Sequence, residues 1–391
     1  ELPNVVVGQW LKYLKITLFA ILVGFGTMFS QSESIEESIT EQAAAQNAAQ
    51  KLFDEGTSNK LTIGGYGEIH SNHPENGNGK VDVHRLVTLF GYKFNDKVQF
   101  ISEIEFEHVK EVYVEQAFMS YSITDNLNLR AGLMLIPMGI VNEYHEPTTF
   151  NGVERPGMDK SIVPSTWREI GFGINGRLDN ASIKYQAYIF NGFSSNGLGG
   201  SNGLRSGRQK GAEAMFNESN LSTRIDYYGI GNLKVGFSGY FGNTNVDVDS
   251  DAPKVGISMV GFDARYTNNR FGARGQYITA SISDTEDYNT YYESNLGSKL
   301  AGYYVEASYN LLETSKTEKL DLFARYSNYD THASVAGSLV ANDAYDRNVL
   351  TTGLTWHVAD GAAFKMDYQI LGNESSDDTS SVLNFGVGVW F

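Results

Sequence analysis

The last eleven residues of the chain, Ser381 to Phe391, alternate strictly between two kinds of side chain. One parity is apolar throughout and comprises Leu383, Phe385, Val387, Val389 and Phe391. The other parity is mostly small or polar and comprises Asn384, Gly386, Gly388 and Trp390. A period of two over this length predicts a β-strand whose two faces meet different surroundings. Such a strand can belong to a soluble sandwich or to a transmembrane barrel, and the rest of the chain distinguishes the two.

This ending resembles the C-terminal strand of bacterial outer-membrane β-barrels, by which the assembly machinery recognises them. The matching residues are Asn384, Gly386, Val387, Val389 and the terminal Phe391. The resemblance implies that the barrel-assembly machinery is a partner, and that Gly386, Val387, Val389 and Phe391 form the assembly signal.

Composition narrows the class of protein. The chain has no Cys, which excludes disulfides and thiolate chemistry, and it is rich in Gly (41), Tyr (23) and Phe (22). Tyr and Phe form the interface girdles of transmembrane barrels. The mean hydropathy of −0.29 is too low for a helical membrane protein. The net charge of −16 disfavours a nucleic-acid partner. Acidic outer loops could hold cations at a lipopolysaccharide surface, although solvation of the loops is the favoured explanation of the charge.

The N-terminal region indicates export. Lys12 and Lys15 precede an apolar run, residues 16–29, that is too short to span a membrane and suits a signal-peptide core. We therefore interpret residues 1–30 as an upstream extension plus a signal peptide. Residues 31–59 are rich in Glu, Gln and Ala, and we expect a periplasmic N-terminal arm, either a short helix or disordered. Residues 60–391 form the predicted transmembrane barrel.

From residue 60 onward, sixteen segments have strand character. They are residues 60–70, 81–94, 98–109, 111–123, 127–136, 168–179, 181–192, 221–230, 233–243, 254–267, 270–282, 302–312, 319–330, 348–359, 362–372 and 381–391. Short connections such as Asn95-Asp96 and Asp360-Gly361 alternate with long ones, and none of the seven prolines falls inside a segment. An even number of strands with alternating short and long connections predicts an all-β, 16-stranded antiparallel transmembrane β-barrel with both ends in the periplasm.

The later segments show which parity faces lipid. Phe364, Met366, Tyr368 and Ile370 alternate with Lys365, Asp367 and Gln369. In a membrane barrel the apolar parity faces outward and the polar parity faces the lumen, which is the reverse of a soluble sandwich.

The segment from Gly132 to Gly173 carries a more specific resemblance. It contains N-E-Y-H-E-P (residues 142–147), G-V-E-R-P (152–156) and I-V-P-S-T-W-R-E (162–169). These pieces are similar to the porin family related to the phosphate-selective outer-membrane porins O and P, in the version found in Bacteroidetes. The resemblance implies sixteen strands, a channel function and a long third outer loop that folds into the lumen.

Residues 137–167 correspond to that loop. They hold four of the seven prolines, which favours a fixed shape over disorder. We expect a constriction there, because charges on an in-folded loop set the width and the field of a pore. The candidate residues are Glu143, His145, Glu146, Glu154, Arg155, Asp159 and Lys160. Glu154 and Arg155 could instead serve only to anchor the loop to the wall.

Parity also predicts the charges of the lumen wall. The basic set comprises Arg130, Arg177, Lys184, Arg224, Lys234, Arg265, Arg274, Arg325 and Lys365. The acidic set comprises Glu68, Glu103, Glu105, Glu107, Glu169, Asp226, Asp263, Glu306, Asp321 and Asp367. Because the two sets nearly balance, we expect weak ion selectivity, with a phosphate- or anion-selective channel as the alternative.

Other motifs predict little chemistry. The glycines of G-F-G-I-N-G (171–176) lie inside a strand segment, so they do not form a dinucleotide site. Asp247, Asp249 and Asp251 have the spacing of a calcium loop without its Gly and Glu, which leaves an adventitious cation site open. His70 and His73 are interpreted as a solvated pair in the first outer loop. No local signature supports an outer-membrane lipase or protease, and an adhesin barrel is a weaker alternative.

Together these features predict a non-enzymatic, homotrimeric porin of the bacterial outer membrane, with no cofactor or resident metal. It would allow passive diffusion of small hydrophilic solutes and ions, and it would contact lipid and lipopolysaccharide.

Overall fold

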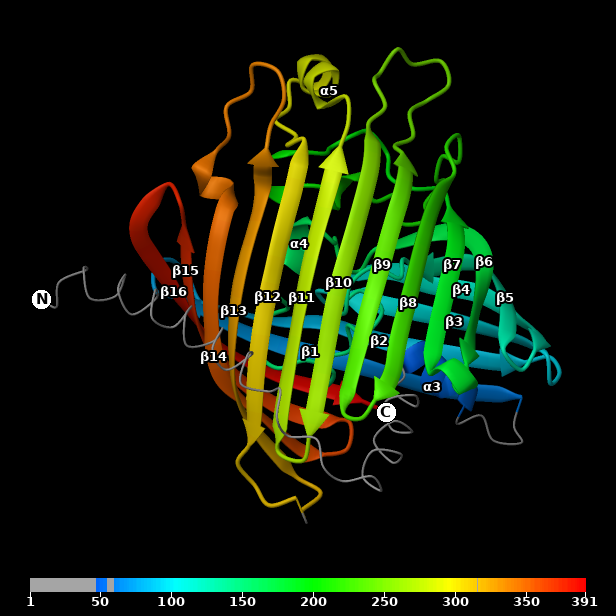
Figure 1. Cartoon of the computed structure of the whole chain (residues 1–391). Helices are drawn as coiled ribbons and strands as arrows, with labels where there is room; N and C mark the ends of the chain where they lie inside the picture. Colours follow the sequence, from blue (N-terminus) through cyan, green and yellow to red (C-terminus); the bar gives the residue numbers. More distant parts are fainter. Residues whose placement is uncertain (1–46, 55–59, 315) are drawn as a thin grey trace, which may run out of the picture.

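The structure, a computed structural model, describes residues 47–54, 60–314 and 316–391 (Figure 1). The expected upstream extension, the signal peptide and most of the N-terminal arm lie outside these residues.

Sixteen antiparallel strands form a closed barrel in which β1 pairs with β16 and every other strand pairs with its neighbours in sequence. The strands are β1 (Leu61–Pro74), β2 (Lys80–Lys93), β3 (Val98–Glu107), β4 (Glu111–Thr124), β5 (Leu127–Leu135), β6 (Arg168–Leu178), β7 (Ile183–Phe190), β8 (Asn220–Ile230), β9 (Leu233–Asn243), β10 (Gly256–Asn268), β11 (Phe271–Ile282), β12 (Lys299–Asn310), β13 (Lys319–Ser334), β14 (Asp346–Ala359), β15 (Ala362–Asn373) and β16 (Ser376–Trp390). Each expected segment overlaps one strand, so the predicted architecture is confirmed. Closure leaves no unpaired strand edge, which a membrane requires because lipid offers no hydrogen bonds.

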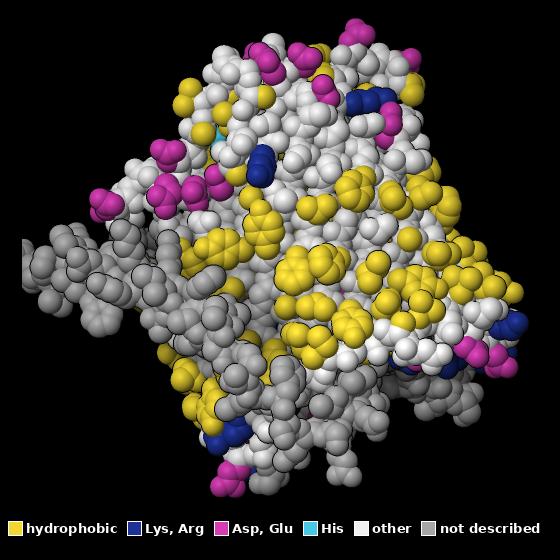
Figure 2. Space-filling model, in the orientation of Figure 1, with side chains coloured by type: hydrophobic (Ala, Val, Ile, Leu, Met, Phe, Trp, Pro, Cys, Tyr) yellow, Lys and Arg dark blue, Asp and Glu magenta, His cyan; other side chains and the backbone are white. Residues whose placement is uncertain are grey.

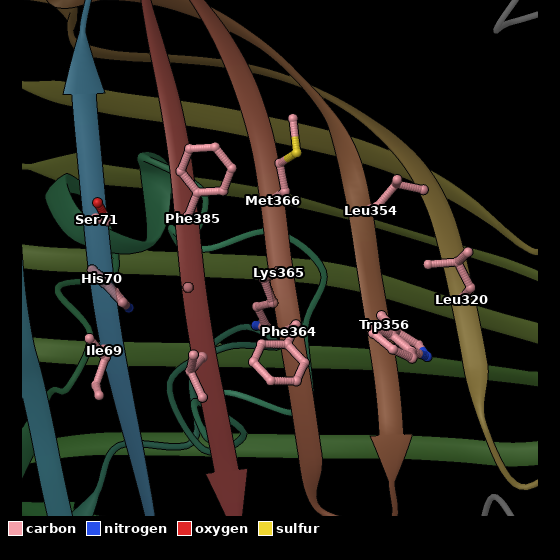
Figure 3. A pocket seen from close by; sticks show the side chains of 12 residues that line it. Ile69, His70, Ser71, Leu320, Leu354, Trp356, Phe364, Lys365, Met366 and Phe385 are labelled. Carbon is pink, nitrogen blue, oxygen red and sulfur yellow. The ribbon is translucent and has the colours of Figure 1, made fainter.

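The two parities face opposite media, as the sequence predicts. On β15, Phe364 is 52% exposed on the outer surface, whereas Lys365 and Asp367 are buried inside the barrel. Figure 2 shows hydrophobic side chains in a band over the strands, with charged side chains gathered toward the ends. The outer surface has an apolar hollow beside Gly386, lined by residues of β1 and β13 to β16 that include Phe364, Met366 and Phe385 (Figure 3).

Two connections that were expected to be longer outer loops are tight. Residues 75–79 join β1 to β2 and residues 374–375 join β15 to β16, while residues 108–110 form the short connection between β3 and β4. These hairpins extend beyond the apolar segments because ladder hydrogen bonds form equally well between strands of polar residues. Pro74 consequently ends β1 and lies inside a strand, contrary to the prediction, at a terminus where little of the ladder is lost.

Two β-bulges shift the parity of the barrel wall. Between β1 and β2, Glu68 pairs with Arg85 and Ile69 with Val83, so His84 is the extra residue. Between β3 and β4 the register shifts in the same way at Glu115. A bulge turns the next side chain to the other face. Arg85 and Glu115, each at most 1% exposed, therefore point into the barrel.

The helices of the described residues are short. They are α3 (Ala48–Asp54), α4 (Met158–Ser161) and α5 (Thr285–Tyr292), with single 3₁₀ turns at Asp179–Ala181, Gly200–Asn202, Arg205–Gly207 and Asp343–Tyr345. None of the described helices is long and apolar enough to cross a membrane. Helix α3 packs on the inner face of the barrel, with Leu52 against Gly64 of β1 and Gly91 of β2. Residues 47–54 are the described part of the expected N-terminal arm.

Candidate channel constriction

The connection between β5 and β6, residues 136–167, is the third loop, and it includes α4. Its base is closed by Asn142, whose side-chain nitrogen donates to the carbonyls of Ile136 and Trp167 at 2.8 and 2.9 Å. The side-chain oxygen of Asn142 accepts from the Trp167 amide at 2.7 Å. The Trp167 ring is fully buried and stacks on Phe193 at 4.4 Å. The two ends of the loop are thus tied together and cannot separate without breaking this network.

The backbone of the third loop contacts inward-facing side chains on one side of the barrel. The guanidinium of Arg224 on β8 donates to the Gly139 carbonyl at 3.0 Å. The Ile140 amide donates to the side-chain oxygen of Gln276 on β11 at 2.5 Å. These bonds hold the first part of the loop against β8 and β11.

Strands on the other side of the barrel hold the middle of the third loop. Lys365 on β15 donates to the carbonyls of Phe150 and Gly152, each at 2.9 Å, and its ammonium lies 3.9 Å from the Phe150 ring centre. The Val153 amide donates to Asp367 on the same strand at 2.6 Å. The loop is therefore bonded to several parts of the wall.

Further loop carbonyls accept from three arginines. Arg274 donates to Thr149 at 3.2 Å, Arg325 to Glu154 at 2.9 Å, and Arg85 to His145 at 2.5 Å. Four of the predicted lumen cations thus donate hydrogen bonds to backbone carbonyls of the loop, namely Arg224, Arg274, Arg325 and Lys365. Arg85 does the same and was missed, because the bulge at His84 reverses its parity.

Two glycines of β16 give the third loop room to approach the wall. A Cβ atom on Gly388 would lie 2.9 Å from Pro147, and one on Gly386 would lie 3.2 Å from Val153. Gly386 belongs to the predicted assembly signal, in which Val387 and Val389 face outward. Phe391 closes the barrel through reciprocal backbone bonds with Gly65, both 2.8 Å. Gly386 and Gly388 are therefore needed for the close contact between the C-terminal strand and the third loop.

Four predicted constriction residues are buried in contacts that hold the loop. Glu143 accepts from Gln186 at 2.9 Å, and Glu146 accepts from the Ala48 amide of α3 at 2.5 Å. His145 lies 2.9 Å from the Tyr66 hydroxyl and 3.6 Å from Glu115.

Asp159 is the fourth of these residues and accepts from Gln276 at 3.0 Å. Burial raises the pKa of Asp159 to about 7, although hydrogen bonding from Gln276 opposes the shift. Its charge state therefore changes near neutral pH.

The remaining predicted loop residues, Glu154, Arg155 and Lys160, line a cavity between the third loop and β1 to β3, here called the outer cavity. Its other charged or imidazole groups are Glu68, His70, His84, Arg85, Glu105, Glu107, Asp159 and Arg205. Arg155 lies 3.6 Å from Glu68, so it both lines the cavity and ties the loop to the wall.

His70 does not lie in the first outer loop, where it was expected. It lies on β1, is 6% exposed, and places its two ring nitrogens 3.2 Å from Glu68 and 3.3 Å from Glu154. Burial raises the pKa of Glu154, but hydrogen bonds from His70 and Asn72 outweigh it and hold the pKa at about 2. His73 also lies on β1, where it is exposed and bonded to Ser71 at 2.8 Å. The expected solvated pair in a loop is therefore wrong.

A second cavity, here called the inner cavity, lies against the third loop at residues 148–151. Its charged wall residues are Arg265, Arg274, Glu306, Asp321 and His357. Glu306 accepts from Arg274 at 3.0 Å and from Arg325 at 3.3 Å, and Asp321 lies 3.8 Å from His357. Glu306 is thus paired with two arginines, and Arg265 lies 3.7 Å from Asp263.

Between β7 and β10, cations surround the Tyr144 ring of the third loop. Lys184, Lys234 and Arg265 lie 5.9, 5.7 and 5.3 Å from its centre. Nearby, Arg224 pairs with Asp226 at 2.7 Å and with Asp263 at 2.9 Å.

β3 carries three of the predicted acidic lumen residues, Glu103, Glu105 and Glu107, and two of them have partners inside the barrel. Glu103 accepts from the Tyr66 hydroxyl and from Gln116, both at 2.5 Å, and Glu105 lies 3.9 Å from Arg85. The third member, Glu107, lines the outer cavity. Glu115, which the bulge turns inward, lies 3.8 Å from Arg168. Two adjacent polar residues within an alternating strand, as in His84-Arg85 and Glu115-Gln116, are the sequence signal that could have revealed both bulges.

Arg177, Glu169 and Arg130 are three further predicted lumen residues that line neither cavity. Arg177 is half exposed and pairs with Asp179 at 2.6 Å beside a short turn. Glu169 is fully buried and accepts from Asn191 and from the Gln209 amide, both at 2.9 Å, so it holds the connection 191–219. Arg130 lies over the Phe118 ring at 5.1 Å.

The chain is similar to known porins. The family model described as phosphate-selective porin O and P matches residues 63–384. A protein of Aquifex aeolicus (strain VF5), described as uncharacterized, is 34% identical over 350 residues, which cover 82% of this chain and 77% of that protein.

Solved structures resemble the barrel. The anion-selective porin from Comamonas acidovorans superposes with a TM-score of 0.58 at 12% identity, over 85% of this chain and 99% of its own. The trimer form of OmpT, an outer-membrane protein of Vibrio cholerae, gives 0.55 at 12% identity over 85% and 99%. OmpF of Salmonella typhi, in complex with daunomycin, gives 0.55 at 14% identity over 85% and 98%. At these identities the likeness shows the fold.

Proposed function

Because the chain belongs to the phosphate-selective porin O and P family and is an outer-membrane channel, we propose that its third loop forms the constriction of a passive, non-enzymatic pore. Small hydrophilic solutes and ions would pass from the outer cavity to the inner cavity beside this loop. The contacts of the loop backbone with β8, β11 and β15 carry this proposal, because a segment bonded to several parts of the wall narrows the lumen between them.

We expect weak ion selectivity. Arg85, Arg224 and Arg274 each lie within 3.0 Å of a carboxylate, so much of their charge is balanced locally. Charges at a narrow, poorly hydrated section weigh most on permeation, since water and salt screen them least.

A preference for anions is the second candidate. The three cations around Tyr144 favour it, since they gather around one loop residue. The porin from Comamonas acidovorans, whose barrel this chain resembles, is anion-selective, which agrees with this candidate.

Reversal potentials of single channels under a salt gradient test both candidates. Two single variants, Arg155→Gln and Lys160→Gln, should each shift the reversal potential toward cation selectivity, because both residues line the outer cavity. Replacing Glu154 with Gln should shift it toward anions. Exposed Asp377 and Asp378 on β16 provide the matched control, since ions in bulk water screen them. Unchanged potentials in all three loop variants would contradict a constriction at this loop.

We further propose that the barrel assembles as a homotrimer in contact with lipid and lipopolysaccharide, in keeping with the trimer form of the Vibrio protein. The proposed assembly signal is tested by deleting Phe391, which should leave unfolded chains in the periplasm. Normal amounts of heat-modifiable barrel in the outer membrane would contradict it.

The contact of helix α3 with Glu146 offers a separate test of how the third loop is held. Proline at the first position of a helix is tolerated but has no amide hydrogen to donate. Ala48→Pro should therefore keep α3 and remove only the bond to Glu146. We expect larger fluctuations of the open-channel current. Lys51→Pro removes the helix bond from the Lys51 amide to the Asn47 carbonyl, so it should disrupt α3 itself and serves as the severe reference.

A further inference from the structure

Among the described residues, two groups of His and carboxylate side chains are spaced to hold a metal ion. One group, Glu103, Glu115 and His145, is fully buried and is joined through the Tyr66 hydroxyl. Its contacts already fix the third loop. The other group, Asp82, His84 and His108, plays no part in holding that loop. The aspartates at 247, 249 and 251 belong to neither group.

We propose that Asp82, His84 and His108 form a binding site for a transition-metal dication, with Zn²⁺ as the representative ion, at the outer mouth of the barrel. Asp82 and His84 lie on β2, and His108 begins the tight connection from β3 to β4. Two imidazoles and one carboxylate suit zinc, copper or nickel, whereas calcium and magnesium prefer oxygen ligands alone.

The spacing of the three side chains fits a single ion. Each offers one ligand atom, and these atoms all lie within 4.8 Å of one another. Nδ1 of His84 lies 3.7 Å, and Nδ1 of His108 lies 2.5 Å, from Oδ2 of Asp82. Ligands of a tetrahedral zinc ion at about 2.0–2.1 Å lie roughly 3.3 Å apart. The first distance is close to this value, and the second reaches it by a small rotation of His108, which is exposed. Water can supply the fourth ligand.

The β-bulge in β2 places this group beside the outer cavity, because it lets His84 and Arg85 face the barrel interior together. His84 is the extra residue, so it turns toward the barrel interior together with its neighbour Arg85. Bulges commonly re-aim a side chain beside a functional site. Without the bulge, the alternation of β2 would place His84 and Arg85 on opposite faces.

Two further contacts fix the orientation of the imidazoles. The His108 amide donates to the His84 carbonyl at 3.3 Å, which holds these two residues side by side. The His70 ring stacks on the His84 ring, with centres 4.4 Å apart and planes 10° from parallel. Because both ring nitrogens of His70 face carboxylates, His70 supports the site without being a ligand. Such supporting contacts pre-orient ligands and strengthen metal binding.

A bound metal would also act on permeation. His84 lines the outer cavity together with Glu154 and Arg155. A dication there adds positive charge at the mouth, so it should shift selectivity toward anions. This second consequence rests on the proposed channel path, whereas binding itself does not.

Equilibrium titration of the purified, tag-free barrel with Zn²⁺ tests the site directly. We expect saturable binding of one ion per chain, with Ca²⁺ and Mg²⁺ unable to compete. The double substitution His84→Ala with His108→Ala should weaken binding by about tenfold or more, and Asp82→Asn should also weaken it. His73→Ala is the matched control, because His73 is an exposed histidine outside the group. Heat-modifiable migration verifies that each variant is folded.

Equal Zn²⁺ affinity in the wild type and in both ligand variants would overturn the proposal, as would a site that Ca²⁺ fills equally well. In lipid bilayers, Zn²⁺ added on the side of the long loops should shift the reversal potential toward anions, and a chelator should reverse the shift. Binding without this shift would preserve the metal site and contradict the path through the outer cavity.

Discussion

Lys365 gives the sharpest test of how the third loop is held. Lys365→Met keeps the length and apolar stem of the side chain but removes the ammonium group. The carbonyls of Phe150 and Gly152 then lose their donor, and the Phe150 ring loses its cation contact. The substitution therefore acts on the loop contact specifically.

The magnitude follows from the two hydrogen bonds. A bond to a charged donor contributes roughly 1.5–3 kcal/mol net, so two contribute roughly 3–6 kcal/mol. Water in the adjoining cavities can replace part of this, which favours the lower end. Since 1.4 kcal/mol is a factor of ten, about 3 kcal/mol lowers the ratio of attached to detached loop by roughly a hundredfold. The barrel itself should stay intact, because β15 pairs with β14 and β16 through its backbone.

Single-channel recording measures the outcome. We expect noisier open-channel currents and a larger mean conductance in Lys365→Met, with thermal unfolding close to that of the wild type. Lys319→Met is the matched control, because Lys319 is exposed and its loss removes the same charge. If the two variants showed the same conductance and the same noise, Lys365 would not hold the loop.

Three further predictions follow from the fold and the third loop. Arginine in place of outward-facing Tyr368 should lower barrel stability in lipid by roughly 2–4 kcal/mol, and much less at inward-facing Gln369; equal costs at the two positions would contradict the membrane orientation. Gly388→Val should displace Pro147 and change single-channel conductance, because even a Cβ atom at position 388 would lie 2.9 Å from Pro147. An unaltered conductance would argue against a close contact between β16 and the third loop. The pKa of Asp159 is raised to about 7 in the folded protein, against an ordinary value of 3.8, so the folded loop should gain stability as pH falls from about 7 toward 4 and lose stability as pH rises. Open-channel noise should therefore increase as pH rises, and this pH dependence should disappear in Asp159→Asn. The same pH dependence in Asp159→Asn would exclude Asp159 as its source.

The architecture of this protein could be predicted from the sequence because the information is local. Alternation with a period of two assigns each strand and each face from neighbouring residues alone, as in Phe364 to Ile370. The family motifs between Gly132 and Gly173 located the third loop, and its prolines indicated a fixed shape. The ends of the outer hairpins were predicted less well, since polar residues continue a ladder without any change of pattern.

The partners of the charged residues could not be predicted, because pairing depends on the register between strands and on the path of the loop. The inward positions of Arg85 and Glu115 depend on bulges, and a bulge is set by the contact of two strands rather than by either strand alone. Parity placed Arg224 and Lys365 inside the barrel correctly. Only the folded loop, lying against those residues, makes them anchors of its backbone, because their donors meet carbonyls far away in the sequence.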